Sequence, residues 1–115
     1  MPHNVIGISI SDIKELNNKE KPDCKKIETA MLDLKIKDKF IYKFKFDKYN
    51  YLNVWVDNAW YAAKDDEKLE YIIFFSKYAQ CSKPHIRTEH IAVVVYDANT
   101  NKEIAHWSYN RAVLE

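Results

Sequence analysis

The densest group of side chains that could perform chemistry lies between Cys81 and His90, in the sequence CSKPHIRTEH. In an extended chain His85, Arg87 and Glu89 lie on one face, whereas His90 lies on the other. Histidine and glutamate can act as general base and acid, and arginine can hold a phosphate. One prediction is therefore a small metal-independent nuclease or toxin domain that uses His85 and Glu89. The simpler interpretation is that these are ordinary loop and edge residues of a β-protein.

The same segment raises the question of a metal, because Cys81, His85, His90 and the later His106 are residue types that zinc accepts. Their spacing lacks the close cysteine or histidine pairs of structural zinc sites, so we predict no metal site. We also expect no cofactor. Phosphate-binding loops need several glycines, and the chain has one, Gly7.

Aromatic side chains give a different signal, because they are concentrated around Trp55 and Trp60. If the segment around Trp55 is a strand, the indole lies on the face opposite Leu52, Val54 and Val56. Exposed tryptophan and tyrosine anchors with a charged rim are typical of protein-binding surfaces, although burial in the core is the competing interpretation. The expected contact residues are Trp55, Asp57, Trp60, Tyr61, Asp65 and Asp66.

A stripe of lysines offers a third hypothesis, in which single-stranded nucleic acid lies along two adjacent strands and stacks its bases on nearby aromatic rings. Lysines on the outer face of a sheet also serve simply to solvate it. The net charge of +1 gives no overall attraction for a polyanion, so this hypothesis ranks below protein binding. The stripe consists of Lys35, Lys37, Lys43, Lys45 and Lys48.

Length and composition predict one globular domain over residues 1–115. With 47% hydrophobic residues the chain can form a hydrophobic core, and its apolar runs are too short to cross a membrane. The first residues lack the basic region and long apolar core of a secretory signal, so we expect a cytoplasmic protein. Cys24 and Cys81 are accordingly expected as two separate reduced thiols, with a single bridge as the alternative in an oxidising compartment.

The strongest structural signal is a predicted hairpin over residues 86–109. The apolar run 91–95 is rich in β-branched residues and is typical of an inner strand covered on both sides. Asp97 and Asn101 bound a polar turn in which Asp and Asn replace the usual glycine. In the return strand, 102–109, Glu103 alternates with His106 and is expected on the opposite face.

The rest of the chain is also dominated by strand patterns. Asp12 is predicted to cap a short helix, with Glu15 completing a capping box. Residues 24–34 fit both a helix behind a cap at Asp23 and a strand from Thr29 onward, and we favour the strand. Residues 59–63 fit a short strand or a helical turn, and residues 111–115 read as a tail. The other predicted strands cover residues 4–10, 40–46, 52–56 and 69–75.

Short polar turns between successive strands predict a meander, and a meander is antiparallel. At roughly five to six residues per strand, about seven strands fit in the chain. The predicted fold class is therefore α+β and mainly antiparallel β. It is expected to form a curved meander sheet or small barrel of about seven strands, with a short N-terminal helix.

For function, the favoured hypothesis is a non-enzymatic protein-binding module that occupies another protein's surface. Its size, mixed charge and aromatic patch suit an inhibitor, by analogy with immunity proteins or phage-encoded blockers of host defence. The partner is expected to be another protein, and the nuclease and nucleic-acid hypotheses are the alternatives.

Overall fold

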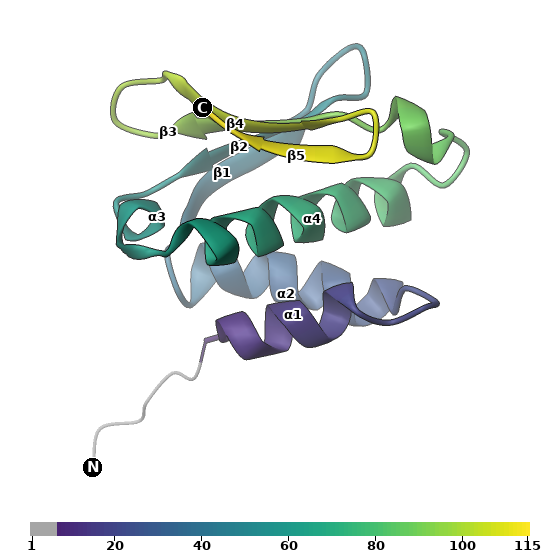
Figure 1. Cartoon of the computed structure of the whole chain (residues 1–115), viewed down its shortest axis with the longest axis horizontal. Coiled ribbons are helices and arrows are strands. Elements are labelled where there is room, and N and C mark those ends of the chain that lie inside the picture. Colours follow the sequence, from purple (N-terminus) through teal and green to yellow (C-terminus); the bar gives the residue numbers. More distant parts are fainter. Residues whose placement is uncertain (1–6) are drawn as a thin grey trace.

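The central element of the fold is a long helix, α4 (Asp65–Ser82), which lies between a β-sheet and two further helices (Figure 1). The structure is a computed structural model that describes residues 7–115. On the side of α4 away from the sheet lie α1 (Ile10–Asn17) and α2 (Cys24–Ile36), both packed against it. A short helix, α3 (Ala59–Ala62), leads into α4, and a 3-10 turn, η1 (Thr88–His90), follows it.

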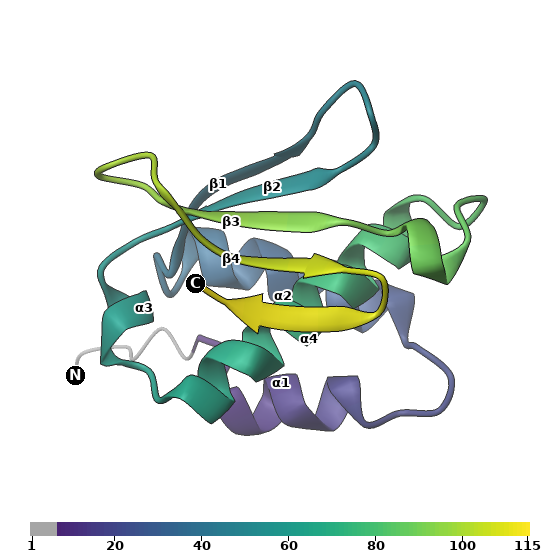
Figure 2. The same cartoon turned by 45° about the horizontal axis from the view of Figure 1, so that its top comes forward.

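The sheet has five strands in the order β1-β2-β3-β4-β5, so β3 lies in the middle (Figure 2). Neighbouring strands are antiparallel except β2 and β3, which are parallel. Parallel neighbours need a long crossover, and here α3 and α4 supply it. The strands are β1 (Ile41–Phe46), β2 (Leu52–Val56), β3 (Val93–Asp97), β4 (Glu103–Ser108) and β5 (Arg111–Leu114).

The predicted architecture is therefore wrong. The α+β class holds, but the sheet is mixed and open with five strands, rather than a meander or barrel of about seven, and helices contribute far more than expected. The segments 40–46, 52–56, 91–95 and 102–109 are confirmed as strands to within a few residues. The strand count is wrong because segments predicted as strands form helices that pack against one face of the sheet.

The predicted strand over 69–75 is the middle of α4, and the reason is its burial on two sides. Ile72, Phe74 and Phe75 are fully buried between the sheet and the other helices. A helix covered on several sides has apolar residues at consecutive positions, so its 3.6-residue period disappears from the sequence. The run Tyr71–Phe75 then resembles a buried strand.

The N-terminal third is also more helical than predicted. The strand favoured from Thr29 onward belongs to α2, which begins behind the cap at Asp23 that the alternative interpretation required. The predicted capping box starting at Asp12 lies one turn earlier, with Ser9 as the cap and Asp12 as its partner. Of the strand predicted over 4–10, residues 4–6 lie outside the described part, and the remainder leads into α1.

Asparagine and aspartate build the turns, as predicted. Asn50 and Asn101 have positive φ, of 63° and 59°, in the β1–β2 and β3–β4 connections. Asp97 accepts hydrogen bonds from the backbone N–H groups of Asn99 and Thr100, at 2.7 and 3.1 Å. The predicted tail is instead the edge strand β5, which a two-residue turn joins to β4.

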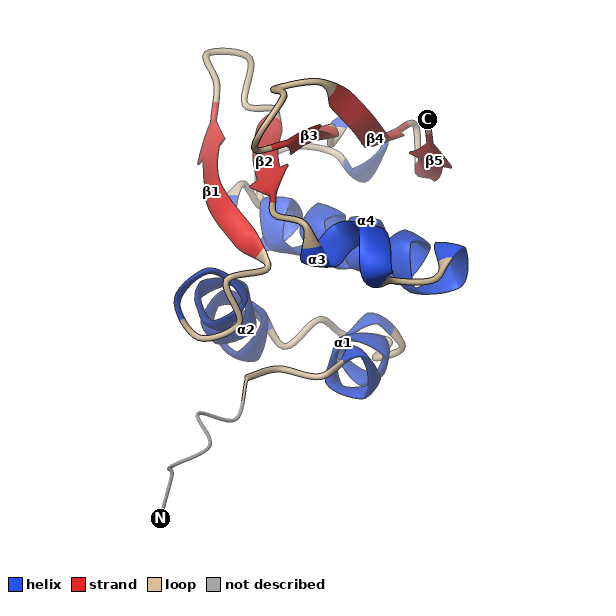
Figure 3. Ribbon diagram, turned by 90° about the vertical axis from the view of Figure 1, so that its left-hand side faces the viewer, coloured by secondary structure: helices blue, strands red, loops and turns tan. Residues whose placement is uncertain are grey.

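The three longer helices of the described chain, α1, α2 and α4, lie on the same side of the sheet (Figure 3). On that face Val93 and Val95 of β3 are fully buried, whereas Val94 and Tyr96, which point the other way, are half-buried. The prediction that β3 is an inner strand is confirmed, but the expected cover on both faces is not found. The sheet therefore presents its second face to solvent.

A disulfide joins Cys24, at the start of α2, to Cys81, near the end of α4, with their Cα atoms 5.5 Å apart. The expectation of two separate reduced thiols is therefore wrong. The two cysteines are 57 residues apart in the chain and become neighbours only because α2 packs along α4. No helix among residues 7–115 is long and apolar enough to span a bilayer.

Candidate functional site

The solvent-facing side of the sheet, here called the open face, carries the most distinctive surface of the molecule. Strand register places its side chains in rows across the strands, because paired residues in neighbouring strands point to the same side. The open face consists of Lys43, Lys45, Asn53, Trp55, Val94, Tyr96, Glu103, His106, Arg111 and Val113.

Trp55 lies at the centre of one such row and is held from three directions. Its ring stacks on Tyr96 of the neighbouring strand β3, with 5.1 Å between ring centroids and an interplanar angle of 20°. On the β1 side, the Lys43 ammonium lies 4.4 Å from the Trp55 ring centroid, within cation–π range. The indole N–H donates a 2.7 Å hydrogen bond to the Asn101 side-chain oxygen. These three contacts hold the Trp55 side chain in one orientation on the sheet.

The predicted lysine stripe does not run over two adjacent strands. Lys43 and Lys45 are on the open face, but Lys35 and Lys37 belong to the end of α2, where Lys37 pairs with Asp33 at 3.6 Å. Lys48 lies in the β1–β2 turn with its ammonium 5.2 Å from the Tyr49 ring centroid. The open face thus keeps two of the five lysines, both beside Trp55.

A rim of exposed tyrosines continues the open face at the end where β1 and β2 are joined. Tyr49, Tyr51 and Tyr109 are 64%, 43% and 79% exposed, so their rings are accessible at the surface. Together with Glu89 and His90 they border a hollow of about 300 Å³. Tyr51 also borders a second hollow, of about 280 Å³, that reaches Val94 and His106 on the open face. The aromatic surface is thus continuous from Tyr51 onto the sheet.

At the other edge of the open face, Glu103, His106 and Glu115 come together. The His106 Nδ1 atom lies 3.6 Å from a Glu103 carboxylate oxygen and 3.1 Å from one of Glu115. A hydrogen bond between the two carboxyl groups raises the pKa of Glu103 and lowers that of Glu115. The open face therefore has lysines on its β1 side and acidic groups on its β4–β5 side, with Trp55 and Tyr96 between them.

The structure separates the six predicted contact residues. Trp55 is on the open face, but Trp60 is 2% exposed and packs in the core against Phe40, with 6.1 Å between ring centroids. Asp65 and Asp66 occupy the first turn of α4, where negative charge stabilises the helix N-terminus. Trp60 is therefore a core residue, whereas Asp65 and Asp66 are exposed and stabilise the start of α4.

Asp57 and Tyr61 lie where β2 ends and α3 begins. Asp57 turns the chain, because its carbonyl accepts the Trp60 backbone N–H at 3.1 Å. The exposed Tyr61 donates its hydroxyl proton in a short hydrogen bond to the Asp97 carboxylate in the β3–β4 turn. That hydrogen bond raises the pKa of Tyr61. The contact holds the β3–β4 turn, and with it Asn101, beside Trp55.

The same contact predicts an acid-sensitive contribution to stability. The Tyr61 hydroxyl, followed by the Asn99 and Thr100 backbone N–H groups, lowers the pKa of Asp97. Because the folded-state pKa is depressed, the stabilisation is complete above the ordinary carboxyl pKa of about 3.9 and is lost as the pH falls through the folded value. Urea unfolding at a series of pH values from about 6 to about 2 measures this. We expect the free energy of unfolding of Asp97→Asn to fall less steeply with decreasing pH than that of the wild type. Equal slopes in the two proteins would show that Asp97 does not contribute to the acid sensitivity.

The segment that suggested nuclease chemistry is not an extended strand. Residues 88–90 form the 3-10 turn η1. The prediction that His85 and Glu89 lie on the same face of an extended strand therefore does not hold. The Arg87 guanidinium pairs with Glu89 at 2.6 Å, which occupies the group expected to hold phosphate. Cys81 is in the disulfide and is not available as a metal ligand.

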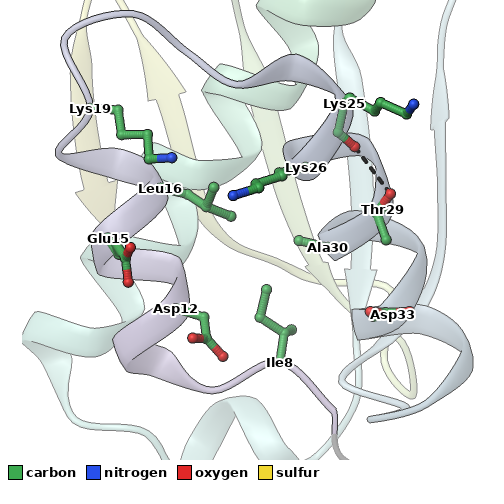
Figure 4. Close-up of a pocket in the computed structure, with 10 residues that line it drawn as sticks. All are labelled: Ile8, Asp12, Glu15, Leu16, Lys19, Lys25, Lys26, Thr29, Ala30 and Asp33. Carbon is green, nitrogen blue, oxygen red and sulfur yellow. Dashed lines mark hydrogen bonds between the residues drawn. The ribbon is translucent and has the colours of Figure 1, made fainter.

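A hollow of about 430 Å³ lies between α1 and α2 (Figure 4). Ile8, Leu16 and Ala30 give it an apolar floor, and charged side chains of both signs border it. Its best-placed polar groups are already engaged: the Asp12 carboxylate accepts hydrogen bonds from Ser9, and the Thr29 hydroxyl donates to the Lys25 carbonyl at 3.1 Å. Glu15, Lys19, Lys25 and Lys26 also border this hollow, which lies on the helical side of the molecule.

Sequence reasoning missed Tyr96, Asn101, Glu103 and Glu115 as site residues. Tyr96 and Asn101 reach Trp55 only because β2 and β3 are parallel neighbours, which a predicted meander excludes. Glu115 reaches His106 because the predicted tail is strand β5. The detectable signal was the continuous apolar run Ala112-Val113-Leu114, which follows the possible turn Tyr109-Asn110.

Comparison of the chain with protein-family models, with curated proteins and with solved structures finds no match in any of the three. What the protein does must therefore be inferred from the chemistry of its own surface.

Proposed function

We propose that this protein is a non-enzymatic binding module that attaches to another protein through the open face, in the manner of an inhibitor. The observation that carries the proposal is the Trp55–Tyr96 stack, which stands on an uncovered sheet between lysines and carboxylates. Aromatic anchors surrounded by polar groups are the usual centre of a protein–protein interface.

The immobility of Trp55 favours protein binding over base stacking. Tyr96 approaches the indole from β3 and Lys43 approaches it from β1, so neighbours stand on both sides of the ring. A stacked base needs an exposed ring face, whereas a protein partner can pack against the exposed ring edges. Because the ring is already ordered, binding costs little additional side-chain entropy.

The charges on the open face indicate the chemistry of the partner. Lys43 and Lys45 are exposed beside Trp55, and the Lys45 ammonium is 5.9 Å from the same ring. A partner that places acidic side chains over these lysines and an apolar group beside Trp55 matches this arrangement. We therefore infer a protein with an acidic patch next to an apolar one. The exposed tyrosines of the rim extend the available surface, since tyrosine is enriched at interfaces.

The disulfide bears on where the protein acts. The expected cytoplasmic location, which rested on the absence of a secretory-signal pattern, implies reduced thiols, whereas disulfides persist mainly in oxidising compartments. We propose that the protein works in an oxidising compartment, which fits an inhibitor of a secreted or periplasmic protein better than a blocker of cytoplasmic defence. Its thiol content in material prepared from the source cells without reductant tests this: free Cys24 and Cys81 would contradict it.

Replacing Trp55 with alanine should remove partner binding while the protein stays folded. Truncation of a central aromatic anchor costs about 2 kcal/mol or more of binding free energy, which corresponds to about 30-fold or more in Kd. The measurement is capture of a partner from a nuclease-treated lysate of the source cells, followed by titration of that partner with the wild type and with Trp55→Ala.

Leu32→Ala is the matched control, since Leu32 is 49% exposed on α2, on the opposite side of the molecule. We expect Leu32→Ala to bind like the wild type. A partner lost with Leu32→Ala but kept with Trp55→Ala would place the interface on the helices and contradict the proposal. Recovery of nucleic acid that disappears on nuclease treatment would favour the nucleic-acid alternative instead.

A further inference from the structure

The cluster of Glu103, His106 and Glu115 combines two carboxylates and one imidazole at the β4–β5 edge of the sheet. One ligand atom from each residue can be chosen so that all three lie within 4.8 Å of one another. The side chains are 41%, 31% and 36% exposed, so an ion can reach them from solvent. This cluster shares no residue with the Trp55 contact, and the proposal above uses only its negative charge.

A break in strand register produces the cluster. In a regular strand, Glu103 and His106 point to opposite faces, because they are three residues apart. Between β3 and β4 the pairing shifts: Ala105 pairs with Val95, but Glu103 pairs with Tyr96, the next residue of β3. The extra residue on β4 turns Glu103 onto the face that His106 occupies, as β-bulges do beside functional sites. The predicted alternation of these two residues is therefore wrong.

The separations between the ligand atoms fit a bound ion. A zinc ion binds imidazole nitrogen and carboxylate oxygen at about 2.0–2.2 Å, so two ligands of a tetrahedral site are separated by about 3.4 Å. The His106 Nδ1 atom is 3.1 Å from Glu115 and 3.6 Å from Glu103, on either side of this value. A divalent cation would also neutralise the two carboxylates, whose ionised forms repel one another.

The surroundings leave room for a further ligand. Glu103 and His106 border the hollow of about 280 Å³ that continues along the open face toward Tyr51. Three protein ligands with one open position, filled by water or by another molecule, are the arrangement of zinc sites that exchange ligands. One imidazole and two carboxylates also suit other divalent transition metals.

We propose that Glu103, His106 and Glu115 form a binding site for one divalent transition metal ion, with Zn²⁺ as the representative ion. The site needs no movement of the backbone, since the bulge and the β4–β5 pairing already hold the three side chains together. It lies on the open face, so a bound ion would present its open coordination position to whatever occupies that face.

Isothermal titration with ZnCl₂ tests the site, with the binding stoichiometry and Kd as readouts. We expect one ion per chain, binding that weakens as the solution is acidified, and at least about a tenfold weaker Kd for His106→Ala, since even loss of an outer-shell partner costs 10–100-fold. Glu115→Gln should weaken binding in the same way and keeps the size of the side chain.

His85→Ala is the control, because His85 is an exposed histidine outside the cluster. It should bind Zn²⁺ like the wild type, and the circular dichroism of all variants should match. Absence of saturable binding by the wild type would overturn the proposal, and so would equal affinity in the wild type and His106→Ala. Loss of binding in His85→Ala alone would assign the ion to the loop before β3 instead.

Discussion

Trp60→Ala should cost about 3–5 kcal/mol of unfolding free energy, because removal of a buried tryptophan leaves a large cavity. Trp60 is 2% exposed and is the largest of the fully buried side chains. It packs beside Phe40, which in turn stacks on Tyr71 of α4 with 4.3 Å between ring centroids. Removal of the Trp60 ring therefore weakens the packing between the sheet and the central helix α4. Against a typical total of about 5–15 kcal/mol, this loss is a large fraction of the free energy of unfolding.

Thermal unfolding followed by circular dichroism measures the effect. A loss of this size lowers the Tm by roughly 10–20 °C for a domain of this length. Tyr42→Ala serves as the control, since Tyr42 is 64% exposed and its truncation should change stability by less than about 1 kcal/mol. Equal Tm values for Trp60→Ala and the wild type would show that Trp60 is not in the core.

Reduction of the Cys24–Cys81 disulfide should destabilise the protein by about 2–4 kcal/mol. The bridge closes a loop of 57 residues, for which the loss of chain entropy in the unfolded state corresponds to about 4 kcal/mol at 25 °C. Cys24 is exposed, so a small reductant can reach the bond in the folded protein. The free energy of unfolding in urea, with and without dithiothreitol, measures the difference.

The double variant Cys24→Ser/Cys81→Ser separates loss of the bridge from other effects of the reductant. It should match the reduced wild type and should not respond to dithiothreitol. An oxidised wild type that unfolds at the same urea concentration before and after reduction would contradict a structural role for the bond.

What the sequence predicted correctly was local. The strands around Val54 and Val95 were identified because one face of each is buried, and period-two alternation or a β-branched run records that burial directly. The turn at Asp97–Asn101 was recognised because Asn and Asp have a chemical reason to replace glycine there. The position of Trp55 on the outward face followed from the same alternation.

What could not be predicted was set by tertiary packing. The apolar run Tyr71–Phe75 resembles a strand because α4 is covered on several sides, and that cover is visible only in the fold. If the α4 segment is predicted as a strand, no long crossover connects β2 to β3, so the two cannot be predicted as parallel neighbours. Without the parallel pairing of β2 and β3, the sequence does not identify Tyr96 and Asn101 as neighbours of Trp55, since Tyr96 belongs to β3 and Asn101 to the turn that follows. The burial of Trp60 could not be predicted for the same reason, because Trp60 packs beside Phe40, which stacks on Tyr71 of α4.

Site-specific photo-crosslinking to the captured partner tests the open-face interface most directly. A photoreactive side chain at Lys45 reports on the open face, and one at Glu28, exposed on α2, reports on the opposite side. We predict a crosslinked complex of one protein with one partner from position 45 and none from position 28. Crosslinking from position 28 alone would contradict the account and assign the interface to the helices.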